Sequence, residues 1–213
     1  MASNNTVSWQ IAKYQTSKKL MELVDKLKPT TPQNAPHIHA GRCKEIDGNN
    51  HRLISCIGVR LLDYTAGTGT KTVQVEANIS PEQCMWIHAV LLRGDKEFSL
   101  TQEKIVSSAK DAKTGRCPVT KMTIARAEFG KDKDGKQVKR THPWYVKIEN
   151  GTGISEATTT GGFMIQKNSY KLDREVYVNL NDMDMFTLFQ RAASYIQVWE
   201  MMNGCALLRQ RSA

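Results

Sequence analysis

The stretch "VQVEANISPEQCMWIHAVLL", residues 73–92, changes its pattern at a single residue. Before Ser80, apolar and polar side chains alternate, which is typical of a strand with one buried face. Ser80 and Pro81 then match the start of a helix, because serine caps the first turn and proline fits its first position. We therefore predict a strand followed by a helix over 81–92, which ends before Gly94.

The run "HRLISCIGVRLLDYT" (51–65) precedes this strand and is rich in branched and apolar residues. It is separated from the strand by "AGTGTKT" (66–72), so the two runs predict a β-hairpin. The glycines and lysine of this turn also resemble part of a phosphate-binding loop. That loop needs lysine directly after its second glycine, and here Thr70 follows Gly69, which excludes it.

The same junction recurs 101 residues later along the chain. The shifted positions are the strand residues Val176, Val178 and Leu180 and a cap at Asn181, before a helix predicted over 182–203. Strand-like runs precede both junctions. Either a strand–strand–strand–strand–helix unit is used twice, or two common junctions match by chance. In both cases we predict an α+β protein with twisted antiparallel sheets backed by helices.

The N-terminal stretch "VSWQIAKYQTSKKLMELVDKL" (7–27) spaces its apolar residues at nearly helical intervals. It predicts an amphipathic helix, and three prolines in residues 28–36 predict a linker after it. The resulting division is an N-terminal helix with linker over 1–36 and one α+β domain over 37–213, containing repeats 37–109 and 110–213 if the unit is duplicated.

The composition is that of a globular protein with a basic excess. Its 213 residues include 30 Lys+Arg and 21 Asp+Glu, a net charge of +9. Such an excess favours polyanionic partners. No apolar run approaches the roughly 18 residues of a membrane span, and the first residues lack a secretory pattern. The five cysteines are an odd number without a CxxC pair, which favours reduced thiols and a cytoplasmic location.

The positive charge is concentrated in residues 110–147, where eleven basic residues face four acidic ones, a net +7. This region contains the turn "GKDKDGK" (130–136) and a strand in which Tyr145 and Lys147 share the face opposite Trp144. Non-specific binding of single strands requires a positive groove together with exposed aromatic rings. The predicted binding residues are Lys121, Arg126, Lys131, Lys133, Lys136, Lys139, Arg140, Tyr145, Lys147, Lys167, Tyr170 and Lys171, with Tyr177 and Phe163 as further candidates for stacking.

Metal binding and catalysis have less support in the sequence. His37, His39, Cys43 and His51 could ligate zinc, but their spacing matches no zinc motif. Neither a GxSxG motif nor paired carboxylates in apolar surroundings occur. We therefore predict a protein that is not an enzyme and that needs no cofactor.

The segments "VQVEANISPEQCMWI" and "VYVNLNDMDMFTLF" (176–189) resemble the strand, cap and helix that end the unit of the Whirly and transcriptional-coactivator type of single-stranded DNA-binding fold. The resemblance covers about thirty residues closely and extends further by the order of elements. It implies nucleic-acid binding on a sheet face and assembly into homo-oligomers.

Charge and resemblance together predict a binding protein for single-stranded DNA or RNA with low sequence specificity, most readily single-stranded DNA. Such a protein would suit recombination or replication in a phage or mobile element. Three alternatives stay open: a ferredoxin-like RNA-binding subunit of an RNA-guided complex, a module that binds and inhibits an acidic protein, and a hydrolase. An ordinary solvated turn at residues 130–136 would also explain the local charge.

Overall fold

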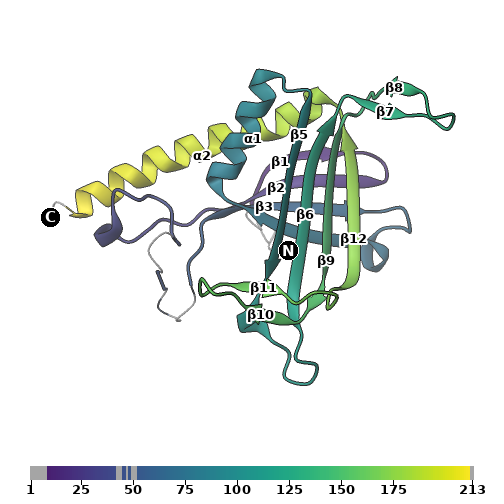
Figure 1. Ribbon diagram of the computed structural model, residues 1–213. Coiled ribbons are helices and arrows are strands. Elements are labelled where there is room, and N and C mark those ends of the chain that lie inside the picture. Colours follow the sequence, from purple (N-terminus) through teal and green to yellow (C-terminus); the bar gives the residue numbers. More distant parts are fainter. Residues whose placement is uncertain (1–8, 42–44, 47, 49–51, 212–213) are drawn as a thin grey trace, which may run out of the picture.

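The structure is a computed structural model that describes residues 9–41, 45–46, 48 and 52–211. It is mixed α+β, as predicted, with mostly antiparallel sheets and two helices, one of them at the C-terminal end (Figure 1). Within the described part of the chain, no helix combines the length and apolar character needed to cross a bilayer.

The first sheet has four antiparallel strands in chain order, and a helix follows the fourth strand directly. The hairpin predicted around residues 66–72 is the turn between its last two strands. The elements are β1 (Gln10–Gln15), β2 (Lys19–Lys26), β3 (Cys56–Asp63), β4 (Val73–Ile79) and α1 (Pro81–Arg93).

The second sheet also has four antiparallel strands in chain order, again followed by a helix. These elements are β5 (Glu97–Ile105), β6 (Cys117–Ala127), β9 (Trp144–Gly153), β12 (Lys171–Leu180) and α2 (Asp182–Arg211). Two short hairpins are inserted, β7 (Phe129–Lys131) with β8 (Gln137–Lys139), and β10 (Ser155–Ala157) with β11 (Phe163–Ile165).

The predicted helix over residues 7–27 is wrong. Residues 10–26 form β1 and β2, which pair with each other, and β2 also pairs with β3. Thr16 makes the turn, since its Oγ1 accepts hydrogen bonds from the amides of Lys18 and Lys19. The division expected at residue 36 therefore falls between two strands of one sheet.

Burial on both faces of β2 explains this error. Leu20, Met21, Leu23 and Val24 are all buried, although their side chains point to opposite sides of the sheet. Apart from Glu22, residues 20–24 are apolar on both faces without alternation, and such a run cannot be distinguished from a helical segment by its period.

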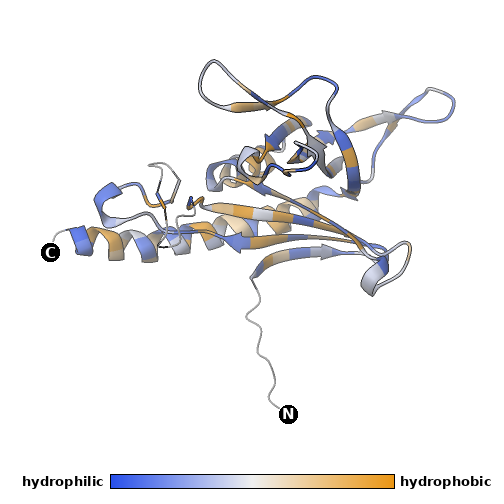
Figure 2. Cartoon of the chain, turned by 90° about the horizontal axis from the view of Figure 1, so that it is seen from below, coloured by the Kyte–Doolittle hydropathy of each residue, from blue (hydrophilic) through white to orange (hydrophobic). Residues whose placement is uncertain are grey.

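The inward faces of the two sheets form one core, and their strands cross steeply (Figure 1). Apolar and polar residues alternate along most of the long strands, β2 excepted (Figure 2). Asn150 of β9 bridges the sheets, because its side chain accepts from the amide of Glu76 at 3.0 Å and donates to the Glu76 carbonyl at 3.1 Å. These two hydrogen bonds satisfy the backbone N–H and C=O of Glu76 on β4, which is an edge strand of the first sheet. The largest fully buried side chains include Trp144, Phe189, Met21, Leu23, Leu61, Met122, Ile124 and Ile148.

Local sequence signals set the start of both helices and the end of α1. Ser80 and Gln83 form a capping box, and Gly94 ends α1 with a left-handed backbone at φ 71°. Asn181 caps α2 by accepting from the amide of Asp184 at 2.8 Å. The predicted end of α2 at residue 203 is wrong, because the helix continues to Arg211.

Gly204 allows α2 to pack closely against the segment that precedes β3. A β-carbon there would lie 3.3 Å from Cδ1 of Ile38, so the missing side chain lets the segment before β3 approach the helix.

Candidate functional site

The outward side chains of the second sheet form three rows, which we call the outer face. Strand pairing places neighbouring residues of β5, β6, β9 and β12 in register. The first row is Ser99, Ala125, Tyr145 and Asn179; the second is Thr101, Thr123, Lys147 and Tyr177; the third is Glu103, Lys121, Glu149 and Glu175. The first row lies nearest to the β7–β8 hairpin.

Two tyrosines dominate the first two rows. The ring centroids of Tyr145 and Tyr177 are 5.7 Å apart, and Tyr177 is 45 % exposed. Nζ of Lys19, the first residue of β2, lies 3.7 Å from the Tyr177 ring centroid. The other residues of these rows on β5 and β6 are small, so the tyrosine rings stand beside a shallow polar surface.

The lysines of the outer face are paired with carboxylates. Nζ of Lys147 lies 2.7 Å from Glu149 and 2.8 Å from Glu175, and these contacts raise the pKa of Lys147. Lys121 lies 2.6 Å from Glu103. The third row therefore presents three carboxylates beside two lysines. Lys147, which the sequence suggested as a phosphate contact next to Tyr145, is held between two glutamates.

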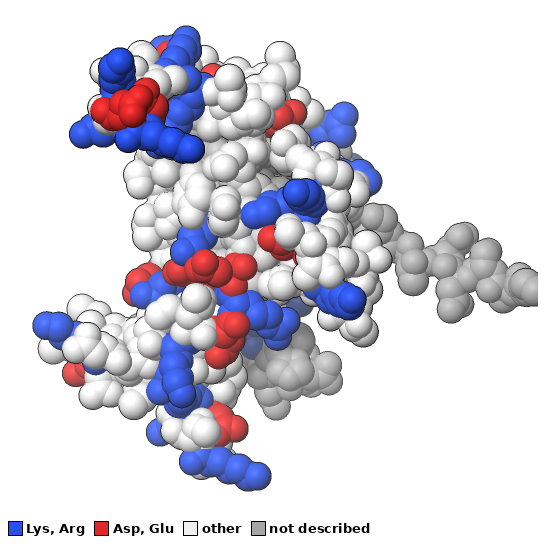
Figure 3. All heavy atoms as spheres, turned by 90° about the vertical axis from the view of Figure 1, so that its right-hand side faces the viewer, with Lys and Arg blue, Asp and Glu red and all other residues white. Residues whose placement is uncertain are grey.

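The basic hairpin projects from the body of the protein (Figure 1), and we call residues 129–140 the arm. Oδ1 of Asp132 accepts from the amides of Asp134 and Lys136, which shapes the turn. Figure 3 shows the basic side chains of the arm surrounding its carboxylates. The exposed basic residues of the arm are Lys131, Lys133, Lys136, Lys139 and Arg140.

The arm and the outer face share one hollow. A space of about 520 Å³ is lined by Lys131, Lys139 and Arg140 of the arm, by His142, and by Asn179 of the first row. A molecule lying on the first row could therefore also contact basic side chains of the arm.

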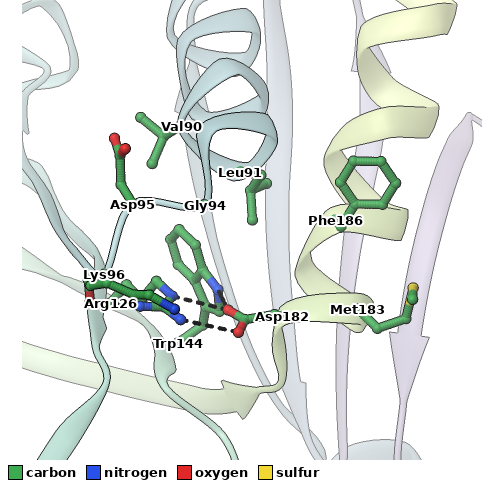
Figure 4. Close-up of a pocket in the computed structure, with 10 residues that line it drawn as sticks. All are labelled: Val90, Leu91, Gly94, Asp95, Lys96, Arg126, Trp144, Asp182, Met183 and Phe186. Atoms are coloured by element: carbon green, nitrogen blue, oxygen red, sulfur yellow. Dashed lines mark hydrogen bonds and ion pairs between the residues drawn. The ribbon is translucent and has the colours of Figure 1, made fainter.

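Arg126 lies apart from this surface. It is 7 % exposed on the inward side of β6, and its guanidinium donates to both carboxylate oxygens of Asp182, at 2.9 and 3.0 Å (Figure 4). The indole of Trp144 donates to the same carboxylate at 2.8 Å. The Arg126 guanidinium holds the pKa of Asp182 below its usual range, since it favours the charged form. This network closes a hollow of about 280 Å³ between α1 and α2 and anchors the start of α2.

The predicted cluster of Lys167, Tyr170 and Lys171 lies at the opposite end of the sheet from the arm. Nζ of Lys121 lies 4.3 Å from the Tyr170 ring centroid, and burial raises the pKa of Tyr170 to about 12. The structure therefore brings together the arm, Tyr145 and Tyr177, and separates them from this second cluster by the carboxylate row.

Sequence reasoning missed two residues of this surface. Asn179 was readable as outward-facing from the alternation around Val178, but its position beside the arm depends on pairing with β9. Lys19 comes from the other sheet, and no pattern near either residue indicates its contact with Tyr177.

Of the four residues considered as zinc ligands, the structure describes His37 and His39. His39 is buried, with Nδ1 2.8 Å from Ser55 Oγ, Nε2 2.8 Å from Glu200 Oε1, and its ring stacked on Trp199. Cys43 and His51 lie outside the described residues. Among the described residues, no group of three or more His, Cys, Asp or Glu side chains could hold a metal ion.

No family model, curated protein or solved structure matches this chain.

Proposed function

We propose that the protein binds single-stranded nucleic acid, most readily DNA, across the outer face of the second sheet. The observation that carries the proposal is the position of Tyr145 and Tyr177. Their rings lie together at the end of the sheet where Asn179 shares a hollow with the basic arm. Aromatic rings for stacking and a positively charged groove beside them are the two requirements for binding single strands without sequence preference.

The path of the strand follows from the three rows. The first two rows offer tyrosine rings and small polar side chains, whereas Glu103, Glu149 and Glu175 of the third row repel phosphates. The strand therefore crosses the sheet on the arm side of these carboxylates. Lys131, Lys133 and Lys136 neutralise its phosphates, and bases stack on the tyrosines.

The repeated order of elements supports a duplicated unit of the Whirly type. Four antiparallel strands in chain order precede a helix in both halves, β1–α1 and β5–α2. In this proposal the two halves share one ancestral plan, and the second half carries the binding face and both inserted hairpins. A role in recombination or replication fits such an activity.

Fluorescence anisotropy tests the proposal with labelled poly-dT, poly-U and duplex DNA at about 50 and about 200 mM salt. We expect poly-dT to bind more tightly than duplex, with an affinity that falls steeply with salt. Equal affinity for single strands and duplex contradicts the stacking role. Absence of binding at the lower salt contradicts the whole proposal and favours an acidic protein as the partner of the arm.

A further inference from the structure

The hollow of about 280 Å³ between α1 and α2, which we call the helix hollow, has a largely apolar wall (Figure 4). Leu91 of α1 and Met183 and Phe186 of α2 contribute to this wall, and the buried Val90 and Trp144 complete it. The volume is just below the roughly 300–1,000 Å³ of sites for small ligands. The helix hollow therefore suits a single ring system.

The Asp182 carboxylate offers a polar contact within this apolar wall. Its side chain is 60 % exposed, although Arg126 and Trp144 donate hydrogen bonds to it. A carboxylate has about four acceptor sites. Two of these hydrogen bonds go to Oδ1 and one goes to Oδ2, so Oδ2 can still accept from an N–H group of a ligand. An apolar wall with a polar group that reads a ring edge is the pattern of a pocket for an unstacked nucleobase.

A second hollow, which we call the passage, connects the helix hollow with the outer face. Its volume is about 400 Å³, and it shares four lining residues with the helix hollow: Lys96, Arg126, Asp182 and Met183. It shares three others with the hollow beside Asn179 of the outer face: Lys139, Arg140 and Thr141. A strand on the first row of the outer face can therefore pass the base of the arm and reach the helix hollow.

The passage carries an excess of positive charge. Nζ of Lys96 and Nζ of Lys139 lie 3.6 and 3.3 Å from the same atom, Oε1 of Glu128. Both lysine side chains are exposed, and Arg140 lines the passage as well. Because three cationic side chains accompany one carboxylate here, the passage favours a phosphate group.

Packing of the two helices closes the helix hollow on the side of Phe186. Nε2 of His88 on α1 lies 2.7 Å from Oε1 of Gln190 on α2, and the His88 ring centroid lies 6.1 Å from that of Phe186. A strand that enters from the passage therefore cannot continue between the helices. The end of a strand can occupy such a site without folding back on itself.

We propose that the helix hollow binds the base at one end of the single strand, and that the phosphate of this nucleotide lies in the passage. This inference rests on the proposed function and adds a preference for strands with free ends. The ring of the terminal base packs against Phe186, and an N–H of its edge donates to Asp182. The rest of the strand crosses the two tyrosines of the outer face.

Linear and circular poly-dT of equal length test this proposal on the full chain, because the circle has no end. Competition against labelled linear poly-dT measures both affinities. We expect the linear strand to bind about ten-fold more tightly, a gain within the range of one additional stacked base. Equal affinities overturn this inference and leave binding on the outer face intact. If neither form binds, the proposed function is wrong, and this inference fails with it.

The variant Met183→Glu locates the preference for ends. Met183 lines both the helix hollow and the passage and is 70 % exposed, so a glutamate there repels phosphate without removing a buried contact. M183E should bind linear and circular poly-dT equally, with the wild-type affinity for the circle. The matched control Met202→Glu changes an equally exposed methionine of α2 and should keep the preference for the linear strand. A preference that M183E retains overturns the assignment to the helix hollow.

Discussion

The rings of Tyr145 and Tyr177 are 5.7 Å apart at an interplanar angle of 34°, although the two residues are not partners in the strand ladder. Tyr145 pairs with Asn179, and Tyr177 pairs with Lys147. The tyrosines are therefore diagonal neighbours, within reach of each other because their side chains are long. This diagonal pair is the proposed stacking platform, and it leads to the first prediction.

Replacing both tyrosines by alanine should weaken the binding of poly-dT by about 1–3 kcal/mol for each base that loses its stacking partner. Y145F/Y177F should bind almost as the wild type, since phenylalanine keeps the ring. Anisotropy titration measures both. Tyr64→Ala, in the turn of the first sheet, is the control and should change nothing. Unaltered binding by Y145A/Y177A would remove the tyrosines from the site.

Neutralising the arm should reduce the dependence of affinity on salt. Each phosphate contact on a single strand contributes about 0.7 to the slope of log K against log salt. K131Q/K133Q/K136Q should therefore lower the slope by about 2 in magnitude. The control K18Q/K28Q/K71Q removes the same charge from exposed positions in the N-terminal half. Equal effects of the two triple variants would mean that net charge, not the arm, determines binding.

Removing the carboxylates beside Lys147 should strengthen binding. In E149Q/E175Q the ammonium group loses both partners, at 2.7 and 2.8 Å, and becomes available to phosphate. We expect several-fold tighter binding of poly-dT and a slope steeper by about 0.7. The control E82Q/E156Q removes two acidic charges elsewhere. If affinity rises equally in both variants, the strand does not pass Lys147.

Asp182→Asn should destabilise the fold in a pH-dependent way. At pH 7 the loss of charge-assisted hydrogen bonds to the buried Arg126 should lower the free energy of unfolding by about 2 kcal/mol. Since the pKa of Asp182 is lowered in the folded state, its contribution is present above the unfolded pKa of about 3.9 and is lost as pH falls through the folded value.

Urea unfolding of the wild type and D182N at pH 7 and at about pH 3 measures this difference. The two unfolding free energies should differ less at the lower pH, because the carboxyl of the unfolded chain is mostly protonated there and part of the contribution of the charge is lost. A gap of equal size at both pH values would show that the charge of Asp182 does not stabilise the fold.

Local signals account for what could be predicted from the sequence. Ser80, Gly94 and Asn181 set helix boundaries through contacts with residues three or four positions away, so the chain around each residue carries the whole signal. The alternation around Tyr145 and Tyr177 likewise identified outward-facing residues, because each strand has one buried face.

Signals that depend on distant contacts were misread. The segment around Leu23 is predicted as a helix because its apolar residues do not alternate. They do not alternate because β2 is buried on both faces, and this burial depends on its place between β1 and β3 in the sheet. The helix predicted to end at residue 203 continues to Arg211, and Gly204 packs against Ile38, which is far away in the sequence. Arg126 is predicted to bind phosphate because it lies in a basic stretch of sequence, and its ion pair with Asp182, 56 residues away, is visible only in the structure.

The sequence by itself determined the helix starts, the alternation of the strands and the local excess of charge, because each is a property of neighbouring residues. The tertiary structure alone decided which positively charged side chains are available to a phosphate. It set Lys147 between Glu149 and Glu175, buried Arg126, and left the lysines of the arm exposed beside the tyrosine rows. The physical reason is that an ion pair across strands depends on register, which the sequence of one strand does not contain.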